Sequence, residues 1–232
     1  MQINLGMSYQ PRIFLAWLLL AAPAYSCFAQ TGPSKSEISS YKGLHQAANV
    51  GDLTLLKTLI ADGNSLEETD RFGRTALHIA AYASHEEIVI ELAKAGANMN
   101  ALEYQAYDIV TIAAVANDYE MLDTALNHGA SADNITSPYA GTALIAAAHL
   151  GHHKAVKRLI DAHAPLDHVN NLNWTALIEA VVLGNGGPDH IQTVKYLVRA
   201  GADKSIADRD GQTPLDLARS YDFGEIIAIL EN

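Results

Sequence analysis

Apolar residues recur at helical spacing in short stretches, and polar, turn-forming segments separate them. In the stretch 86–95, Ile88, Leu92 and Ala95 fall on one face of a helix. Gly96 follows directly, and glycine readily adopts the left-handed conformation that ends a helix. This pattern predicts an amphipathic helix over 86–95 that buries one side.

A thinner helix is predicted just before it. Thr75 is a good N-cap because its hydroxyl can accept an amide hydrogen from the first helical turn. Ala80 and Ala81 keep this helix thin, so neighbouring units can approach closely. The preceding segment 64–74 is polar and turn-forming, and we expect it to project as a β-turn finger. One such helix pair buries only one face, so its stability must come from stacked neighbours.

The unit repeats along the chain. The position of Thr75 recurs in steps of 33, 33, 34, 33 and 38 residues, at Lys42, Thr75, Asp108, Thr142, Thr175 and Thr213. The helix-ending glycine forms a second ladder, at Gly63, Gly96, Gly129 and Gly201, with a missing rung at His163. Both ladders place the irregular steps in the same repeats, which makes a chance pattern untenable.

The best-matching segments read GRTALHIAA over 73–81 and GANMN over 96–100. With these motifs the chain resembles the ankyrin-repeat family, and the resemblance covers 40–232. It implies an all-α solenoid of about five to six helix-turn-helix units with β-turn fingers. It also implies that His45 and His78 bridge neighbouring loops by hydrogen bonds. Residues 30–39 are then expected to be a linker.

Three departures from the family pattern stand out. Asp108 replaces the N-cap threonine in repeat three, and His163 replaces the closing glycine in repeat four. Repeat five is five residues longer than the usual unit, and the extra residues fall within 184–190. We expect a lengthened turn there, with Asp189 capping the helix that follows.

The first 29 residues read as a signal peptide. Arg12 immediately precedes the apolar run 13–22, which is too short to span a membrane. Cleavage after Ala29 would release a soluble product. An alternative cleavage before Cys27 would leave a lipid anchor on that cysteine. Either way, localisation in the periplasm or outside the cell is expected, and no internal cysteine remains to mispair in an oxidising compartment.

Charge and composition narrow the function. The chain has 15 Lys and Arg against 26 Asp and Glu, a formal net charge of −11. This argues against nucleic acid as a partner, because phosphate binding needs a basic surface. It favours a protein partner that carries a basic patch.

Catalytic motifs are missing from the sequence. There is no Gly-x-Ser-x-Gly motif, and the only cysteine, Cys27, lies in the signal peptide. We therefore predict that the protein is not an enzyme and needs no cofactor. The histidine-rich segment 149–153 in repeat four leaves one alternative, metal or haem handling in oxidative-stress defence.

The resemblance places the partner-binding face on the fingers and on the ends of the first helices. Tyr, Trp and Arg dominate protein interfaces, and several occupy these positions. The predicted binding residues are Phe72, Arg74, Tyr82, Tyr104, Gln105, Tyr107, Tyr139, His149, Leu172, Trp174 and Leu183. The leading interpretation is an exported protein-interaction scaffold. An effector or immunity-type protein that binds a toxin or host factor remains open.

Overall fold

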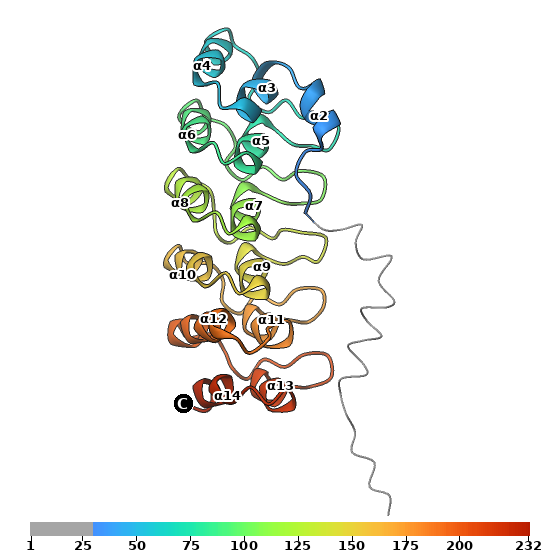
Figure 1. Cartoon of the computed structure of the whole chain (residues 1–232), viewed down its shortest axis with the longest axis vertical. Coiled ribbons are helices and arrows are strands. Elements are labelled where there is room, and N and C mark those ends of the chain that lie inside the picture. The colour runs from blue at the N-terminus through green and yellow to red at the C-terminus, as the bar shows by residue number, and fades with distance from the viewer. Residues whose placement is uncertain (1–29) are drawn as a thin grey trace, which may run out of the picture.

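The computed structural model describes residues 30–232, which form a stack of helix pairs (Figure 1). The six pairs are α3 (Gly43–Val50) with α4 (Leu53–Ala61), α5 (Ala76–Tyr82) with α6 (Glu86–Lys94), α7 (Ile109–Ala116) with α8 (Tyr119–Asn127), α9 (Ala143–Leu150) with α10 (His153–Asp161), α11 (Ala176–Val182) with α12 (Pro188–Ala200), and α13 (Pro214–Ser220) with α14 (Gly224–Glu231). The predicted all-α ankyrin solenoid is confirmed.

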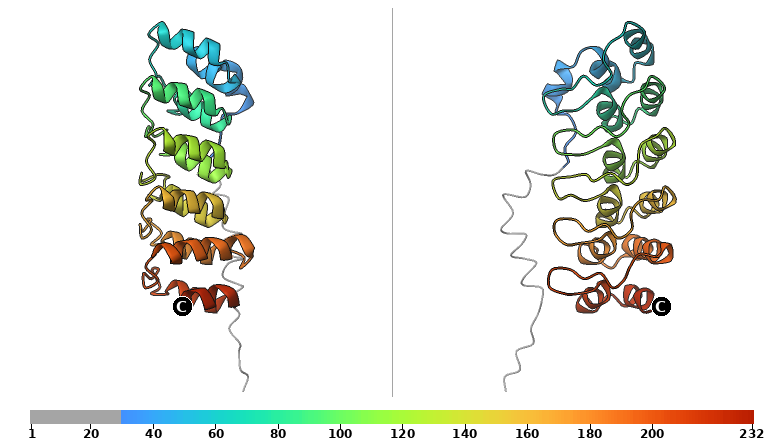
Figure 2. Two further views of the ribbon diagram at one scale, coloured as in Figure 1. Left: turned by 90° about the vertical axis from the view of Figure 1, so that its left-hand side faces the viewer. Right: turned by 180° about the vertical axis from the view of Figure 1, so that it is seen from behind.

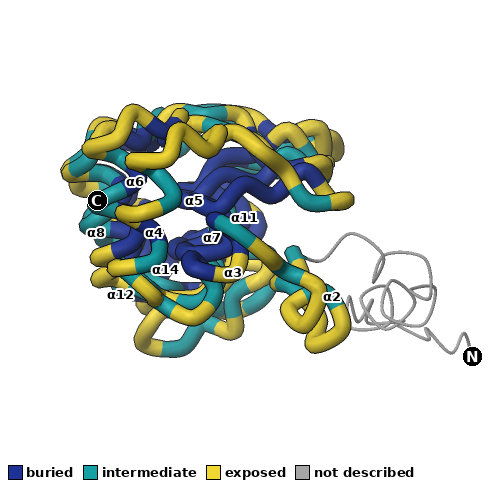
Figure 3. The backbone as a smooth tube through the Cα atoms, turned by 90° about the horizontal axis from the view of Figure 1, so that it is seen from above, coloured by how far each residue is buried: buried dark blue, intermediate teal, exposed yellow. Residues whose placement is uncertain are grey.

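The first helices of the pairs form one row and the second helices another. Each finger projects from the row of first helices, and all fingers leave the stack on the same side (Figure 2). The buried backbone follows the row of first helices (Figure 3), and each second helix contributes a few buried residues to the same core. Leu122, Leu144 and Leu177 are fully buried there, and the paired alanines of the first helices fill the close contacts between units.

The residue that starts the first helix caps it with its side chain in most repeats, although Lys42 in the first repeat does not. Thr142 and Thr175 accept hydrogen bonds from amides three residues later, as predicted for this position. In repeat three the Asp108 carboxylate accepts from the amide of Thr111 at 2.8 Å, so aspartate replaces threonine without loss of the cap. The first departure from the family pattern is therefore a conservative exchange.

The glycine ladder marks left-handed backbone after each second helix. Gly96 and Gly129 have φ of 92° and 101°. His163 has φ of 63°, so it occupies the rung that the spacing predicted, in a conformation that glycine adopts more easily.

The extra residues of repeat five correct one prediction. They lengthen the turn after α11, but they also extend α12 to 13 residues, whereas α10 has nine. The N-cap is Gly187, with Pro188 in the first turn. Asp189 therefore does not cap the helix as predicted. It lies inside the first turn, where its carboxylate faces His153 Nδ1 at 3.3 Å.

The segment expected to be a linker contains a short helix, α2 (Lys35–Ser40). The Ser34 side chain accepts from the Glu37 amide, and the Glu37 side chain accepts from the Ser34 amide at 2.6 Å. This reciprocal capping box starts the helix. None of the residues of α2 is buried, and Figure 3 shows it at the edge of the stack.

Residues 1–29 lie outside the described residues, and with them the predicted signal peptide and Cys27. Within residues 30–232, no helix combines the length and apolar character that crossing a bilayer requires.

Candidate functional site

In most fingers, a side chain with an acceptor oxygen lies five residues before the N-cap and shapes the turn. In the first complete finger, Asp70 Oδ1 accepts from the amides of Phe72 at 2.8 Å and Arg74 at 3.0 Å. The same pair of bonds, to the second and fourth following amides, is made by Glu103, Asn170 and Asp208. These four fingers are thus each closed by a side-chain oxygen that binds two amides of the same turn, whereas in the finger before Thr142 the Ser137 hydroxyl accepts only from the amide of Tyr139, at 3.2 Å.

Neighbouring fingers are joined to each other through their backbones. The amide of Tyr104 donates to the carbonyl of Phe72 at 2.9 Å, and that of Asn171 donates to the carbonyl of Tyr139 at 2.9 Å. A third bond of this kind joins Ser137 to Ala106 at 2.8 Å. These bonds hold the tips of consecutive fingers side by side, so side chains at the tips form a row.

Two histidines support the fingers from the first helices. His45 Nε2 lies 2.9 Å from the carbonyl oxygen of Arg74, and His78 Nε2 lies 3.0 Å from that of Ala101. The predicted bridging role is confirmed for both. Burial lowers the pKa of His78, although nearby carbonyls and the carboxylate of Asp108 oppose this. The ring is therefore neutral and donates through Nε2 at neutral pH.

The predicted binding residues separate into three groups by exposure. Five are exposed: Phe72, Tyr104, His149, Leu172 and Leu183. Four are half-buried: Tyr82, Gln105, Tyr139 and Trp174. Two are buried: Arg74 and Tyr107. The finger tips bring Phe72, Tyr104, Gln105, Tyr139 and Leu172 into one row, whereas Tyr82, His149 and Leu183 lie at the carboxyl ends of first helices.

The placement of Arg74 and Tyr107 corrects the sequence interpretation. Both precede the N-cap directly and were expected on the exposed variable face, yet they are only 3% and 6% exposed. This position is the base of the finger, where the chain turns inward to enter the first helix. Tyr107 joins the core, and burial raises its pKa. Arg74 is enclosed by carboxylates instead.

Tyr104 is the most exposed large side chain of the tip row, at 75%. Its ring lies over Gly73 of the preceding finger. A Cβ at that glycine would come within 2.4 Å of Tyr104 Cδ1, and φ there is 79°. Glycine is therefore needed at position 73 for two reasons: it adopts the left-handed backbone of the turn, and it leaves room for the Tyr104 ring.

The histidine segment 149–153 does not converge on one point. His149 Nδ1 lies 3.1 Å from Glu179 Oε2, and His152 Nδ1 lies 2.9 Å from the carbonyl oxygen of Ala114. His153 faces Asp189. Among the described residues no group of three or more His, Cys, Asp or Glu side chains is placed to hold a metal ion. This geometry does not support the alternative of metal or haem handling.

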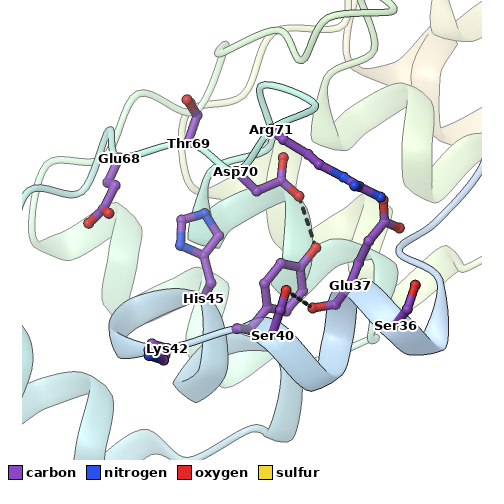
Figure 4. Close-up of a pocket in the computed structure, with 10 residues that line it drawn as sticks. Ser36, Glu37, Ser40, Lys42, His45, Glu68, Thr69, Asp70 and Arg71 are labelled. Atoms are coloured by element: carbon purple, nitrogen blue, oxygen red, sulfur yellow. Dashed lines mark hydrogen bonds and ion pairs between the residues drawn. The ribbon is translucent and has the colours of Figure 1, made fainter.

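A polar cleft of about 490 Å³ lies at the N-terminal end of the stack, between α2, α3 and the first finger (Figure 4). Its lining is Ser36, Glu37, Ser40, Tyr41, Lys42, His45, Glu68, Thr69, Asp70 and Arg71. Tyr41 donates its hydroxyl to Asp70 Oδ2 at 2.9 Å across the cleft. Treating 30–39 as a linker missed this site, although the Ser34–Glu37 capping box was a readable signal for it.

Comparison with known proteins identifies the family. The family model for ankyrin repeats (three copies) matches residues 44–136 and 110–208. The ankyrin repeat protein YahD of Escherichia coli (strain K12) is 34% identical over 187 residues, which cover 79% of this chain and 92% of YahD. The chain belongs to the ankyrin-repeat family.

Solved structures agree with this assignment. The ankyrin repeat domain ABAYE2397 of Acinetobacter baumannii AYE superposes with a TM-score of 0.77 at 39% identity, over 81% of this chain and 95% of that domain. A chain in the complex of the Bd0816 predatory endopeptidase of Bdellovibrio bacteriovorus with immunity protein Bd3460 has a TM-score of 0.64 at 25% identity. It covers 83% of this chain and 98% of that one. Ankyrin repeats are interaction modules that present extended concave surfaces to proteins.

Proposed function

We propose that this ankyrin-repeat chain is a non-enzymatic scaffold that binds a protein partner on its fingers and first helices. The observation that carries the proposal is the row of apolar tip residues. Phe72, Tyr104 and Leu172 are 39%, 75% and 38% exposed, on fingers whose backbones are tied together. Exposed aromatic and aliphatic side chains on a fixed frame are the anchors that protein interfaces use.

Rigidity supports the same proposal. The tips that carry Phe72, Tyr104 and Leu172 are each fixed by a side-chain oxygen within their own finger and by a backbone bond to a neighbouring finger. Such a surface loses little conformational entropy when it binds, so more of the contact energy contributes to affinity.

Export is part of the proposal and rests on the signal-peptide pattern of residues 1–29. The partner would then be met in the periplasm or outside the cell. Removal of residues 1–29 takes away Arg12 and no acidic residue, so the exported chain has 14 Lys and Arg against 26 Asp and Glu, a net charge of −12. This charge favours a partner with a basic patch and an association that weakens as salt is added.

A second candidate function is an immunity-type role, in which the partner is an enzyme that the scaffold inhibits. The similarity to a chain in the endopeptidase–immunity protein complex favours it. The two functions differ in one readout. An inhibitor lowers the hydrolytic activity of the captured partner, whereas a scaffold leaves that activity unchanged.

The test is capture from a periplasmic extract of the source organism by the wild type and by Phe72→Ser/Tyr104→Ser/Leu172→Ser. Tyr119→Ser is the matched control, because Tyr119 is 45% exposed on α8, in the row of second helices. We expect a protein captured by the wild type and the control to be lost by the triple variant. Equal capture by all three would overturn the proposed face.

A further inference from the structure

Residues 30–41, which we call the strap, run across the N-terminal end of the finger face. At one end, Gly32 lies against the ring of Tyr82, where an added Cβ would come within 3.2 Å of Cδ1. Further along, Glu37 meets Arg74 at 3.4 Å. The strap therefore covers two of the residues that the sequence pattern assigned to partner binding, Arg74 and Tyr82.

The strap is attached mainly by polar contacts around Glu37 and Tyr41. Its helix α2 buries none of its residues, and Ile38 is 37% exposed. Glu37 makes the central contact, with one carboxylate oxygen 3.1 Å from Arg71 Nη2 and the other 3.4 Å from Arg74 Nη2. Tyr41 adds a hydrogen bond to Asp70. Its apolar contacts are few: Gly32 lies against the Tyr82 ring, and the Tyr41 ring packs beside His45, with ring centroids 5.6 Å apart.

The surface beneath Glu37 is built to receive a carboxylate. The guanidinium carbons of Arg71 and Arg74 lie 4.7 Å and 4.6 Å from the centre of the Phe72 ring. Asp70 fixes Arg74 from the other side, through Nε at 2.8 Å and Nη2 at 2.7 Å. Two oriented guanidinium groups beside an aromatic ring form a preorganised anion site in an otherwise acidic protein.

Glu37 is ionised in this position. Burial on its own would raise the pKa of its carboxyl, but hydrogen bonds from Ser34 and Arg71 and the charge of Arg74 lower it to about 2. The strap thus presents a full negative charge to the two arginines at neutral pH.

We propose that Arg71, Arg74 and Phe72 recognise an acidic segment of the protein partner, whose carboxylate takes the place that Glu37 fills in the free chain. This inference rests on the proposed function and adds the chemistry of one contact. The basic patch expected of the partner would meet the acidic remainder of the surface, while this end of the finger face selects a carboxylate. The partner must displace the strap to bind here.

The test replaces the partner with a probe of known sequence. A labelled synthetic peptide covering residues 33–41 is titrated against the full chain, its Glu37→Gln variant and its Glu68→Gln variant, with binding read by fluorescence anisotropy. Glu68→Gln is the matched control. Glu68 lines the same cleft but is exposed, so this substitution removes one negative charge and leaves the contacts of Glu37 with the two arginines in place. Circular dichroism confirms that each variant is folded.

We expect the peptide to bind the Glu37→Gln chain about tenfold more tightly than the wild type or the Glu68→Gln chain. A peptide that itself carries Glu37→Gln should bind the Glu37→Gln chain about tenfold more weakly than the unmodified peptide does. Equal binding of both peptides, or equal binding by the Glu37→Gln and Glu68→Gln chains, would overturn the inference. So would a failure of the peptide to bind any chain at millimolar concentration.

Hydrogen exchange gives an independent readout on the same chains. Amides of residues 35–41 should exchange faster in Glu37→Gln than in Glu68→Gln, and equal rates would contradict the role of Glu37. Neither experiment uses the natural partner, so failure of the capture experiment and failure of this inference are separate results.

Discussion

His78 Nε2 lies 3.0 Å from the carbonyl oxygen of Ala101, so a side chain of α5 holds the backbone at the base of the next finger. The other ring nitrogen, Nδ1, accepts from the amide of Thr75 at 3.1 Å. One fully buried ring therefore joins its own N-cap to the following repeat. Because neighbouring units stabilise each other, such a link contributes to the whole stack.

We expect His78→Gln to lower the free energy of unfolding by about 2 kcal/mol, because buried polar groups lose their partners. His168→Gln is the matched control, since His168 makes a similar bond to the carbonyl of Ala140 near the surface. Urea unfolding monitored by circular dichroism compares the two. A loss no larger for His78 than for His168 would contradict the linking role.

The same histidine predicts a pH dependence. Burial lowers the pKa of His78 below 6.5, so the unfolded chain binds this proton more readily than the folded chain. Its contribution to stability is complete above about pH 6.5 and is lost as the pH falls towards the lowered value. Urea unfolding at a series of pH values should show this decline in the wild type and a shallower one in His78→Gln. Identical slopes would show that another group is responsible.

His163→Gly should stabilise the protein. The residue has φ of 63°, where a side chain costs about 1 kcal/mol that glycine avoids. We expect a higher Tm for this variant and a lower one for the reciprocal Gly129→His, since Gly129 occupies the equivalent position with φ of 101°. Thermal unfolding of both variants tests this. A lower Tm for His163→Gly would mean that contacts of the imidazole stabilise the protein by more than the backbone strain destabilises it.

Tyr104 and Tyr107 lie three residues apart in one finger, and truncation should destabilise the protein far more at Tyr107 than at Tyr104. Tyr104→Ala should change the free energy of unfolding by less than about 0.5 kcal/mol, because the side chain is 75% exposed. Tyr107→Ala should cost about 3 kcal/mol, because that ring is part of the core. Denaturant unfolding of both variants tests this directly. Similar losses would mean that the tip residues also support the stack.

Much of the fold follows from the sequence because each repeat carries the same local signals in the same phase. The N-caps and the left-handed rungs could be placed even at Asp108 and His163, where the residue type departs from the pattern. The spacing of the repeats shows which position of the unit a residue occupies, and the backbone at the N-cap and at the left-handed position is similar from repeat to repeat.

The direction of a finger side chain could not be obtained in this way. Tyr104 and Tyr107 lie three residues apart at variable positions of one finger, yet one is on the surface and the other inside, because the finger turns between them. Arg74 is buried for a further reason, since Glu37 of α2 lies against it. That contact depends on a segment outside the repeat pattern, where periodicity gives no information.

The most direct test of the interaction face is site-specific photo-crosslinking. Tyr104 and Tyr119 are replaced in separate chains by p-benzoylphenylalanine, which preserves an aromatic side chain at both exposed positions. Each chain is expressed in the source organism and irradiated, and adducts are identified by mass spectrometry. The proposed function predicts a protein adduct at Tyr104, on the finger row, and none at Tyr119, on α8. An adduct at Tyr119 alone, or the same adduct at both, would contradict it.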